Sequence, residues 1–221
     1  MPLIEHMVYP DRSESGIWKI EESKEELMHH LDLSKDERKE MERFSWHQRQ
    51  LQWLAVRWLL FKMSGRSLRG KVFKDTSGKP NLAESEFNIT LSHSHAFVAA
   101  AAAPYPVGVD IQVKSERMRR IIQKFADEKE LQACQERENL NLAHIIWSAK
   151  ECMFKAFGQD EVSFSKHLHV SKPEEIHCQE ARGEFKGQVH KGDEIMTFDF
   201  VFSQDDEKVF VLGKSVEGQS L

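Results

Sequence analysis

Residues 144–156 contain the polar side chains whose spacing most strongly suggests chemistry. Apolar residues recur there at helical spacing, and Glu151 and Lys155 lie four residues apart on one face, with Lys150 alongside. On an ordinary helix such a pair is a solvent-exposed ion pair that contributes a few tenths of a kcal/mol. The helix by itself therefore does not distinguish a surface pair from a reactive site.

The stretch 107–113 predicts a strand with one polar face. Its valines and isoleucine face one way, while Gly108, Asp110 and Gln112 face the other. A carboxylate there needs a partner, because an unpaired buried charge is strongly unfavourable. Asp110 either caps a turn at the strand end or ligates Mg²⁺, which proteins bind through one or two carboxylates together with substrate phosphates.

Two further segments carry polar residues between short predicted strands. His93 and His95 would share one strand face, but no third His or Cys stands at a spacing typical of zinc sites. A hydrogen bond from a histidine to a phosphate is therefore favoured over zinc. The segment 77–80 is a turn with one lysine, and it lacks the GxxxxGK[ST] frame of a P-loop.

Helices and short strands must position these side chains. Capping-box spacing marks two helix starts, Ser34 with Glu37 and Asp127 with Glu130. The predicted helices cover 34–63 with a break near 45–46, about 115–138, and about 141–157 before Gly158. Strands are predicted at 17–20, 72–73, 87–91, 96–103 and 107–113, and near 167–170, 184–190, 195–202 and 208–213. Each half reads as helices followed by strands, so we expect an α+β fold with a hinge at Pro104–Pro106.

Length and composition exclude several classes of protein. The 221 residues suit one large domain or two small ones, and 40% are apolar, which is enough for a packed core. A net charge of −5 argues against a nucleic-acid binder. Three widely spaced cysteines favour a reducing cytosol over a disulfide framework. We read no signal peptide and no apolar stretch long enough to span a membrane, so we expect a cytoplasmic protein.

In this order and spacing, the four polar segments resemble the 4′-phosphopantetheinyl transferase superfamily, in particular its longer Sfp-type members, which are similar to holo-acyl-carrier-protein synthase. The family's motifs run GKP, FN-x-SHS, G-[IV]-D-[IL]-E and W-x-x-K-E-[SAC]-x-x-K. This sequence has them as Gly78-Lys79-Pro80, Asn88 with Ser92-His93-Ser94, Gly108-Val109-Asp110-Ile111-Gln112, and Trp147 to Lys155. The resemblance covers about residues 40–158, and the last motif is the most specific.

The resemblance implies transfer of the phosphopantetheine arm of coenzyme A to a serine of an apo carrier protein, with Mg²⁺ and release of 3′,5′-ADP. Asp110 and Glu151 would ligate the metal, and Glu151, or a water it orients, would accept the serine proton. The remaining residues would contact coenzyme A: Lys150 and Lys155 the phosphates, Lys79 and Pro80 the adenosine end, His93 the 3′-phosphate, and Lys74 and Arg57 as further basic contacts. For Arg57 a surface position or a structural salt bridge is the alternative.

Gln112 departs from the family pattern, which usually has Glu at this position. Its amide oxygen could still contact the metal, but the site loses one negative charge. The main alternative function is therefore a non-catalytic relative that binds coenzyme A or a carrier protein without transfer. A second alternative, nucleic-acid binding by the Arg- and Trp-rich helix around 46–62, conflicts with the acidic net charge.

The resemblance also implies the arrangement of the chain. We expect two similar α+β subdomains, residues 1–105 and 106–221, that form a pseudo-dimer with coenzyme A in the cleft between them. Because one chain would then supply both halves of the site, we expect a monomer. An acyl or peptidyl carrier protein is the expected partner, with no membrane partner.

Overall fold

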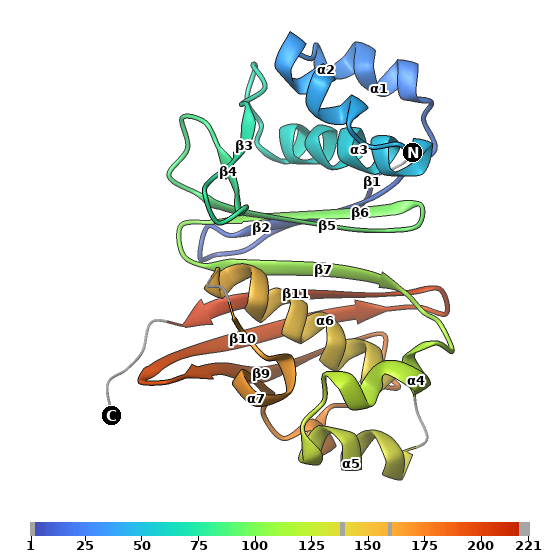
Figure 1. Ribbon diagram of the computed structural model, residues 1–221, viewed down its shortest axis with the longest axis vertical. Helices are drawn as coiled ribbons and strands as arrows, with labels where there is room; N and C mark the ends of the chain where they lie inside the picture. Colours follow the sequence, from blue (N-terminus) through green and yellow to red (C-terminus); the bar gives the residue numbers. More distant parts are fainter. Residues whose placement is uncertain (1–2, 138–139, 159–160, 217–221) are drawn as a thin grey trace.

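The computed structural model describes residues 3–137, 140–158 and 161–216, and it confirms the α+β class. Two antiparallel sheets lie one above the other, and each is covered on its outer side by a long helix (Figure 1). The first sheet has the order β1-β2-β6-β5 and the second β7-β11-β10-β9-β8. A small hairpin, β3-β4, stands beside the first sheet.

Most of the strands lie where the sequence predicts them. Those of the first half are β1 Leu3–Val8, β2 Glu14–Lys19, β3 Val72–Lys74, β4 Pro80–Leu82, β5 Asn88–Ser94 and β6 Phe97–Ala103. Those of the second half are β7 Val107–Val113, β8 Leu168–Val170, β9 Arg182–Lys191, β10 Glu194–Gln204 and β11 Lys208–Val216. The loop 104–106 joins the last strand of the first sheet to the first strand of the second.

Helices of the first half begin at serine caps. Ser34 and Glu37 make the predicted capping box of α2 (Lys35–Glu42), and a second box at Ser23 begins α1 (Lys24–Leu31), which the sequence reading did not predict. The expected break is confirmed, because four residues separate the end of α2 from the start of α3 (His47–Met63). The buried side of α3 packs on β6 and β2.

Helices of the second half surround one buried helix, α6 (Leu140–Phe157). The predicted stretch 115–138 is divided into α4 (Met118–Ile121), a 3₁₀ turn (Ile122–Lys124) and α5 (Glu128–Arg137). The backbone N–H groups of Asp127 and Glu130 each donate to the other's carboxylate, which confirms this cap. The half is completed by α7 (Phe164–His167) and a second 3₁₀ turn (Pro173–Glu175).

A third apolar core joins the two sheets. It contains Ile17 of β2 and four residues of β6, which contact side chains of β7 and β11. The members from the second sheet are Val107, Val109, Ile111, Phe210 and Leu212. Because this layer is apolar and buried, it holds the halves together by the same force that builds each separate core.

A row of hydroxyl groups joins the edge strand of the first sheet to that of the second. Three alternate residues of β7 donate their backbone N–H groups to the side chains of three alternate residues of β5. The pairs are Val109 to Thr90 at 3.2 Å, Ile111 to Ser92 at 3.2 Å and Val113 to Ser94 at 3.0 Å. These hydroxyls satisfy buried amides that would otherwise lack partners. We call this row the hydroxyl seam.

Candidate active site

Asp110 lies on β7 with its carboxylate between the two halves of the chain. Its side chain is buried, and Oδ1 accepts hydrogen bonds from Ser92 Oγ at 2.7 Å and from Lys155 Nζ at 2.9 Å. The other oxygen, Oδ2, is buried and has no hydrogen-bond partner. A buried carboxylate oxygen without a donor is strongly unfavourable unless a cation satisfies it.

Gly108 explains how α6 comes close enough to Asp110. A Cβ built on Gly108 would lie 2.0 Å from the carbonyl oxygen of Cys152, so only glycine permits this approach of β7 to the helix. Asp110 and Gln112 share this face of the strand, because strand side chains alternate. The Gly108 contact thus turns the polar face of β7 toward the Glu151 and Lys155 region of α6.

Lys155 reaches from α6 to β7. Its ammonium donates to Asp110 Oδ1 and, at 2.9 Å, to the carbonyl oxygen of Val109. Burial by itself would lower the pKa of Lys155, but the negative charges of Asp110 and Glu151 raise it. The lysine is therefore protonated at neutral pH. The ion pair of Lys155 is with the strand-borne Asp110, which overturns the interpretation of Glu151 and Lys155 as an exposed pair on one helix.

Glu151 lies one turn before Lys155 and is half-buried. Burial raises its pKa above the usual value near 4.5, and the charge of Asp110 raises it further, while Lys155 lowers it. The two carboxylates therefore lie within electrostatic reach of each other. The charge of a strand carboxylate thus acts on a helix carboxylate.

The donor set fits a magnesium ion better than a zinc ion. Two carboxylates and the half-buried amide of Gln112 offer only hard oxygen ligands, and Asp110 Oδ2 is buried without a partner. Within the described ranges, no group of three or more His, Cys, Asp and Glu side chains converges. Structural zinc sites are built from Cys and His ligands, which Asp110, Glu151 and Gln112 do not offer.

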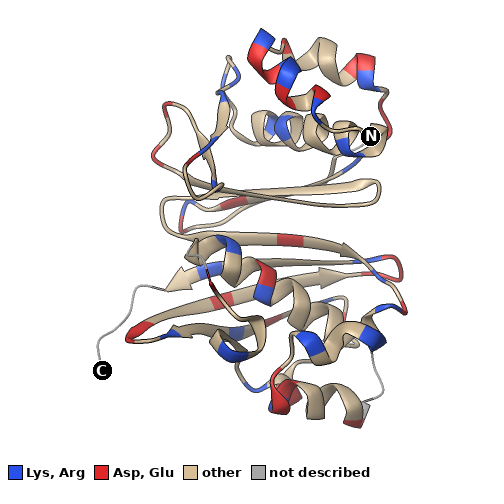
Figure 2. Cartoon of the chain, viewed as in Figure 1, with Lys and Arg blue, Asp and Glu red and all other residues tan. Residues whose placement is uncertain are grey.

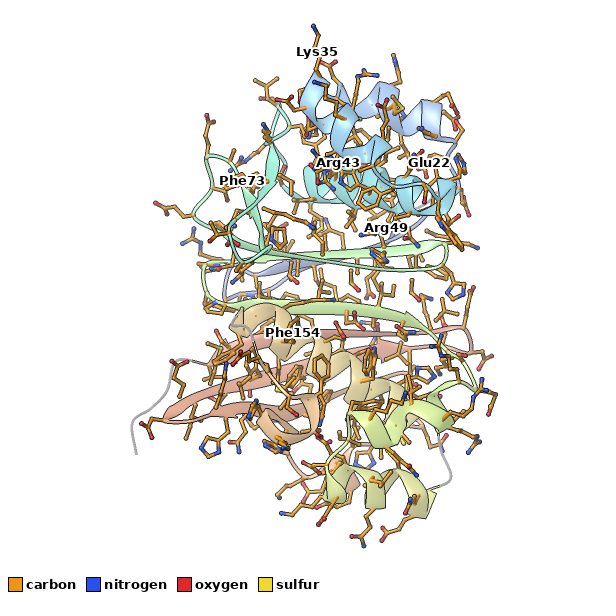
Figure 3. All side chains as sticks on the ribbon, viewed as in Figure 1. Glu22, Lys35, Arg43, Arg49, Phe73 and Phe154 are labelled. Atoms are coloured by element: carbon orange, nitrogen blue, oxygen red, sulfur yellow. The ribbon has the colours of Figure 1, made fainter. Side chains whose placement is uncertain are left out.

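A pocket of about 160 Å³ adjoins Lys155. Its walls come from the 77–80 turn, from residues 89–91 of β5 and from the end of α6, where Phe154 and Gly158 contribute. Figure 3 labels Phe154 on the outer side of α6, close to β7. Among the predicted contacts, Lys79 and Pro80 line this pocket together with Lys155, whereas Lys74 is exposed on β3 and is not part of its wall.

Asp75 shapes the turn that presents Lys79. Its Oδ1 accepts from the backbone N–H groups of Ser77 and Lys79 and from the Ser77 hydroxyl, and its Oδ2 accepts from Asn81. Gly78 adopts a φ of +84°, which glycine tolerates without strain. The turn thus holds Lys79 over the end of α6, with Lys79 Cδ 3.7 Å from the place where a Cβ on Gly158 would lie.

His93 lies within electrostatic reach of two cations, Arg49 and Lys155. Partial burial lowers the pKa of His93 to about 4, and the positive charges of Arg49 and Lys155 lower it further. His93 is therefore neutral at neutral pH and able to donate a ring N–H. The sequence does not indicate Arg49 as a site residue, because only the packing of α3 on the first sheet brings its charge within reach of His93.

Lys150 is not at the site, which corrects the expectation that it contacts phosphate. Its side chain is fully buried, and the ammonium donates to Glu130 Oε2 at 2.6 Å and to two carbonyl oxygens, of Phe125 at 2.8 Å and Phe164 at 2.9 Å. All three of its N–H groups are thus used inside the second half. Helical geometry explains the error, because neighbouring residues on a helix point about 100° apart.

Arg57 is likewise a structural residue of the first half. It is buried, stacks 3.4 Å above the ring of Trp53, and has Nη2 3.6 Å from Glu40 Oε1. Burial lowers its pKa to about 10. The structural salt bridge, and not a contact to coenzyme A, is therefore the role that fits Arg57.

The helix around 46–62 buries part of its aromatic and basic surface in the first half. Trp53 and Arg57 are buried and Trp58 is half-buried, whereas Trp46 is largely exposed. Acidic and basic residues are mixed over both halves of the described chain (Figure 2). The buried tryptophan and arginine of α3 cannot belong to the exposed basic and aromatic surface on which the nucleic-acid alternative depends.

His95 has a structural explanation that the sequence could not supply. It lies in the β5–β6 turn with a φ of +52°, and its carbonyl oxygen accepts from Gln48 at 2.8 Å and Gln52 at 2.9 Å. These bonds attach the turn to α3. His95 therefore anchors the strand that carries His93, and it does not form a metal pair with it.

Comparison with known proteins bears on this site. Residues 106–199 match the 4′-phosphopantetheinyl transferase superfamily. The match contains β7 and α6, hence Asp110, Glu151 and Lys155, and it supports a transferase. A search of curated proteins found no match.

Two further observations delimit the site. A larger cavity of about 610 Å³ lies elsewhere, beside β8 and the start of α5, and contains none of the predicted site residues. In the described part of the chain, no helix is long and apolar enough to cross a membrane.

Proposed function

We propose that this protein transfers the 4′-phosphopantetheine arm of coenzyme A to a serine of an apo acyl or peptidyl carrier protein, with Mg²⁺. The observation that carries the proposal is the buried Asp110 carboxylate, with one oxygen held by Ser92 and Lys155 and the other without a hydrogen-bond partner. The superfamily match over residues 106–199 supports the same reaction.

Asp110 and Glu151 would hold the metal, with the Gln112 amide oxygen as a third group. A bound Mg²⁺ would neutralise charge on the pyrophosphate of coenzyme A. Lys155 would contact a pyrophosphate oxygen as a point charge, since its ammonium already lies at the metal-facing carboxylate. Lys79 and Pro80 would contact the adenosine end in the adjoining pocket, and His93 and Arg49 would contact the 3′-phosphate. Lys74, exposed nearby, is proposed as a peripheral contact.

The reaction forms one phosphorus–oxygen bond and breaks another. The serine oxygen of the carrier attacks the β-phosphorus of coenzyme A, and the bond to the leaving 3′,5′-ADP breaks. Glu151, or a water that it orients, accepts the serine proton, which suits a carboxylate whose pKa is raised toward neutrality. The enzyme's part is mainly positioning and charge stabilisation, as in other phosphoryl transfers.

The carrier's mass tests the proposal directly. Incubation of the protein with coenzyme A, Mg²⁺ and an apo carrier should increase the carrier's mass by one phosphopantetheine, and 3′,5′-ADP should appear in equal amount. Omission of Mg²⁺ and an Asp110→Asn variant should each abolish the increase. A panel of fatty-acid, polyketide and peptide-synthetase carriers then identifies the partner.

The non-catalytic alternative rests on Gln112, which removes one charge from the metal site. It predicts that coenzyme A binds while no carrier on the panel gains mass. We favour the enzyme because Lys155 contacts Asp110, and the charges of both residues act on Glu151. We further propose that one chain suffices, with the two subdomains divided near residue 105, so activity should be proportional to enzyme concentration and the active species should have the mass of one chain.

A further inference from the structure

The motif residues of α6 make contacts in two different parts of the molecule. Lys155 reaches Asp110 on β7, whereas Trp147 and Lys150 contact residues packed inside the second half. The ring of Trp147 lies between two phenylalanine rings, with centroid distances of 4.9 Å to Phe125 and 5.5 Å to Phe164. Lys150, one turn later, donates to the backbone carbonyls of the same two phenylalanines.

The charge partner of Lys150 completes this arrangement. Glu130 is fully buried, and its Oε2 accepts from the Lys150 ammonium and from the backbone N–H of Asp127 at 2.8 Å. Its Oε1 accepts from the backbone N–H of Val170 at 2.9 Å. Every proton of the ammonium is thus donated, and both carboxylate oxygens are satisfied. Such a pair adds little net stability compared with apolar residues, but it fixes geometry firmly.

The held phenylalanine reaches the proposed substrate pocket. The ring of Phe164 lies 5.6 Å from that of Phe154, and Phe154 lines the pocket beside Lys155 and Lys79. A series of contacts therefore links the buried Lys150 ammonium to the Phe164 carbonyl, and the Phe164 ring to Phe154 in the pocket wall. Phe154 is itself partly exposed, and the ring of Phe164 is one of the protein groups that support it.

We propose that Trp147 and Lys150, with Glu130, form a positioning unit that sets the pocket wall at Phe154. In this assignment, which rests on the proposed function, Lys150 touches no substrate. It locks Phe125 and Phe164 around Trp147, so that Phe164 supports Phe154 where the adenosine end of coenzyme A would lie. Glu151 and Lys155 form the separate catalytic unit of the same helix.

Four variants test the unit: Lys150→Met, Glu130→Gln, the double variant, and Lys129→Met as a control on the exposed side of α5. Each single variant leaves a buried partner unsatisfied, so both should lower the melting temperature, and the double variant should recover part of the loss. The Michaelis constant for coenzyme A should rise about tenfold in the two single variants and the double variant, while kcat should change less. Loss of residues that support a site without touching the substrate typically has an effect of this size or larger. Lys129→Met should match the natural protein.

The comparison separates positioning from two other roles. In the double variant, the Michaelis constant for coenzyme A could return toward the natural value together with the melting temperature. That result would show that the pair is merely structural and would overturn the proposal. A rise in Lys150→Met alone, with none in Glu130→Gln, would make Lys150 a phosphate ligand and overturn it equally. Phe164→Leu removes the ring contact but leaves the Lys150–Glu130 ion pair intact. If the charge variants do not fold, this variant still tests the proposal, because it should raise the Michaelis constant for coenzyme A.

Failure of the proposed function would be recognised separately. If the natural protein modifies no carrier, the near-ultraviolet circular dichroism of Trp147, assigned with Trp147→Phe, still reports on the unit. It should be lost in Lys150→Met and in Glu130→Gln and kept in Lys129→Met. Retention of the signal in the charge variants would refute the positioning unit whatever the protein's activity.

Discussion

At the scale of single residues, Glu151 combines a raised pKa with a neighbouring cation. Burial makes its charged form unfavourable, and Asp110 adds repulsion, so the carboxylate gains a proton at a higher pH than an exposed glutamate. A general base must be deprotonated to act. The raised pKa of Glu151 therefore leads to a prediction of how activity depends on pH.

We predict that kcat/KM falls as the pH is lowered through the raised pKa of Glu151, and that the midpoint lies above the usual value near 4.5. Glu151→Gln should lower turnover by a factor of about 100 or more, without loss of fold, because it removes a buried charge. The carrier mass assay over a pH series, with circular dichroism, measures both. Glu184→Gln on the exposed part of β9 is the control, and unchanged turnover in Glu151→Gln would remove that residue from its role.

Gln112 makes a second prediction at this scale. Gln112→Glu adds a negative charge to the polar face of β7 that carries Asp110, so it should lower the Mg²⁺ concentration that gives half-maximal activity by about tenfold, equivalent to about 1.4 kcal/mol. Titration of activity with Mg²⁺ at constant coenzyme A measures the change. A half-maximal concentration that stays the same would place residue 112 outside the metal site.

At the scale of elements, the hydroxyl seam connects the two sheets through side chains instead of a continuous ladder. Ser92 has two tasks, since its Oγ accepts from the Ile111 amide and donates to Asp110, whereas Ser94 accepts from the Val113 amide. This difference provides a matched pair of variants. Both serines are buried on the same strand.

We predict that Ser92→Ala lowers the free energy of unfolding by about 2 kcal/mol, the cost of unsatisfied buried groups, and that it also impairs activity. Ser94→Ala should lower stability by about half as much, because the second contact of Ser94, with His95 Nδ1, is long at 3.5 Å. It should leave turnover nearly unchanged. Urea unfolding and the carrier assay measure the two effects. Equal effects on turnover would show that the Ser92–Asp110 bond does not orient the carboxylate.

Gly108 makes the contact between β7 and α6 possible. We predict that Gly108→Ala destabilises the protein by about 3 kcal/mol and strongly lowers activity, since its Cβ would collide with the Cys152 carbonyl. Gly192→Ala in the β9–β10 turn, where nothing lies within 4 Å, should cost only the strain of a positive φ, about 1 kcal/mol. Similar losses of activity in both would mean that the close approach is unimportant for the site.

At the scale of the whole molecule, metal binding and protonation of Glu151 are linked. A buried acid with a raised pKa favours the folded state at low pH, and that contribution is lost as the pH rises through the raised pKa. A cation bound to the Glu151 carboxylate would stabilise its charged form in the folded state. The repulsion between Asp110 and Glu151 therefore predicts a pH-dependent stabilisation by metal.

We predict that Mg²⁺ raises the melting temperature of the coenzyme A complex by about 5 °C at neutral pH, as expected for saturation of a site on the folded state. The increment should shrink as the pH falls below the raised pKa of Glu151. Thermal scans with and without Mg²⁺ over a pH series measure it. In Asp110→Asn the increment should vanish, and an increment independent of pH would contradict the linkage.

Predictability differed between local and distant features. The capping boxes at Ser34 and Asp127, the stop at Gly158 and the alternation of β7 were predicted correctly because they depend on neighbours in the sequence. The helix at 24–31 was missed although Ser23 and Glu26 form the same box. Arg49 was missed as a site residue because it meets His93 only through the packing of α3 on the first sheet.

The sequence by itself determined the periods of the helices and strands, the turn that carries Lys79, and the set of polar residues able to do chemistry. The tertiary structure decided which of them meet. Lys150 and Lys155 have the same chemistry and stand five residues apart, yet one is locked in the core and the other reaches Asp110. The reason is that a helix turns each residue to a new direction, and only the packing of β7 and the second core decides what lies in that direction.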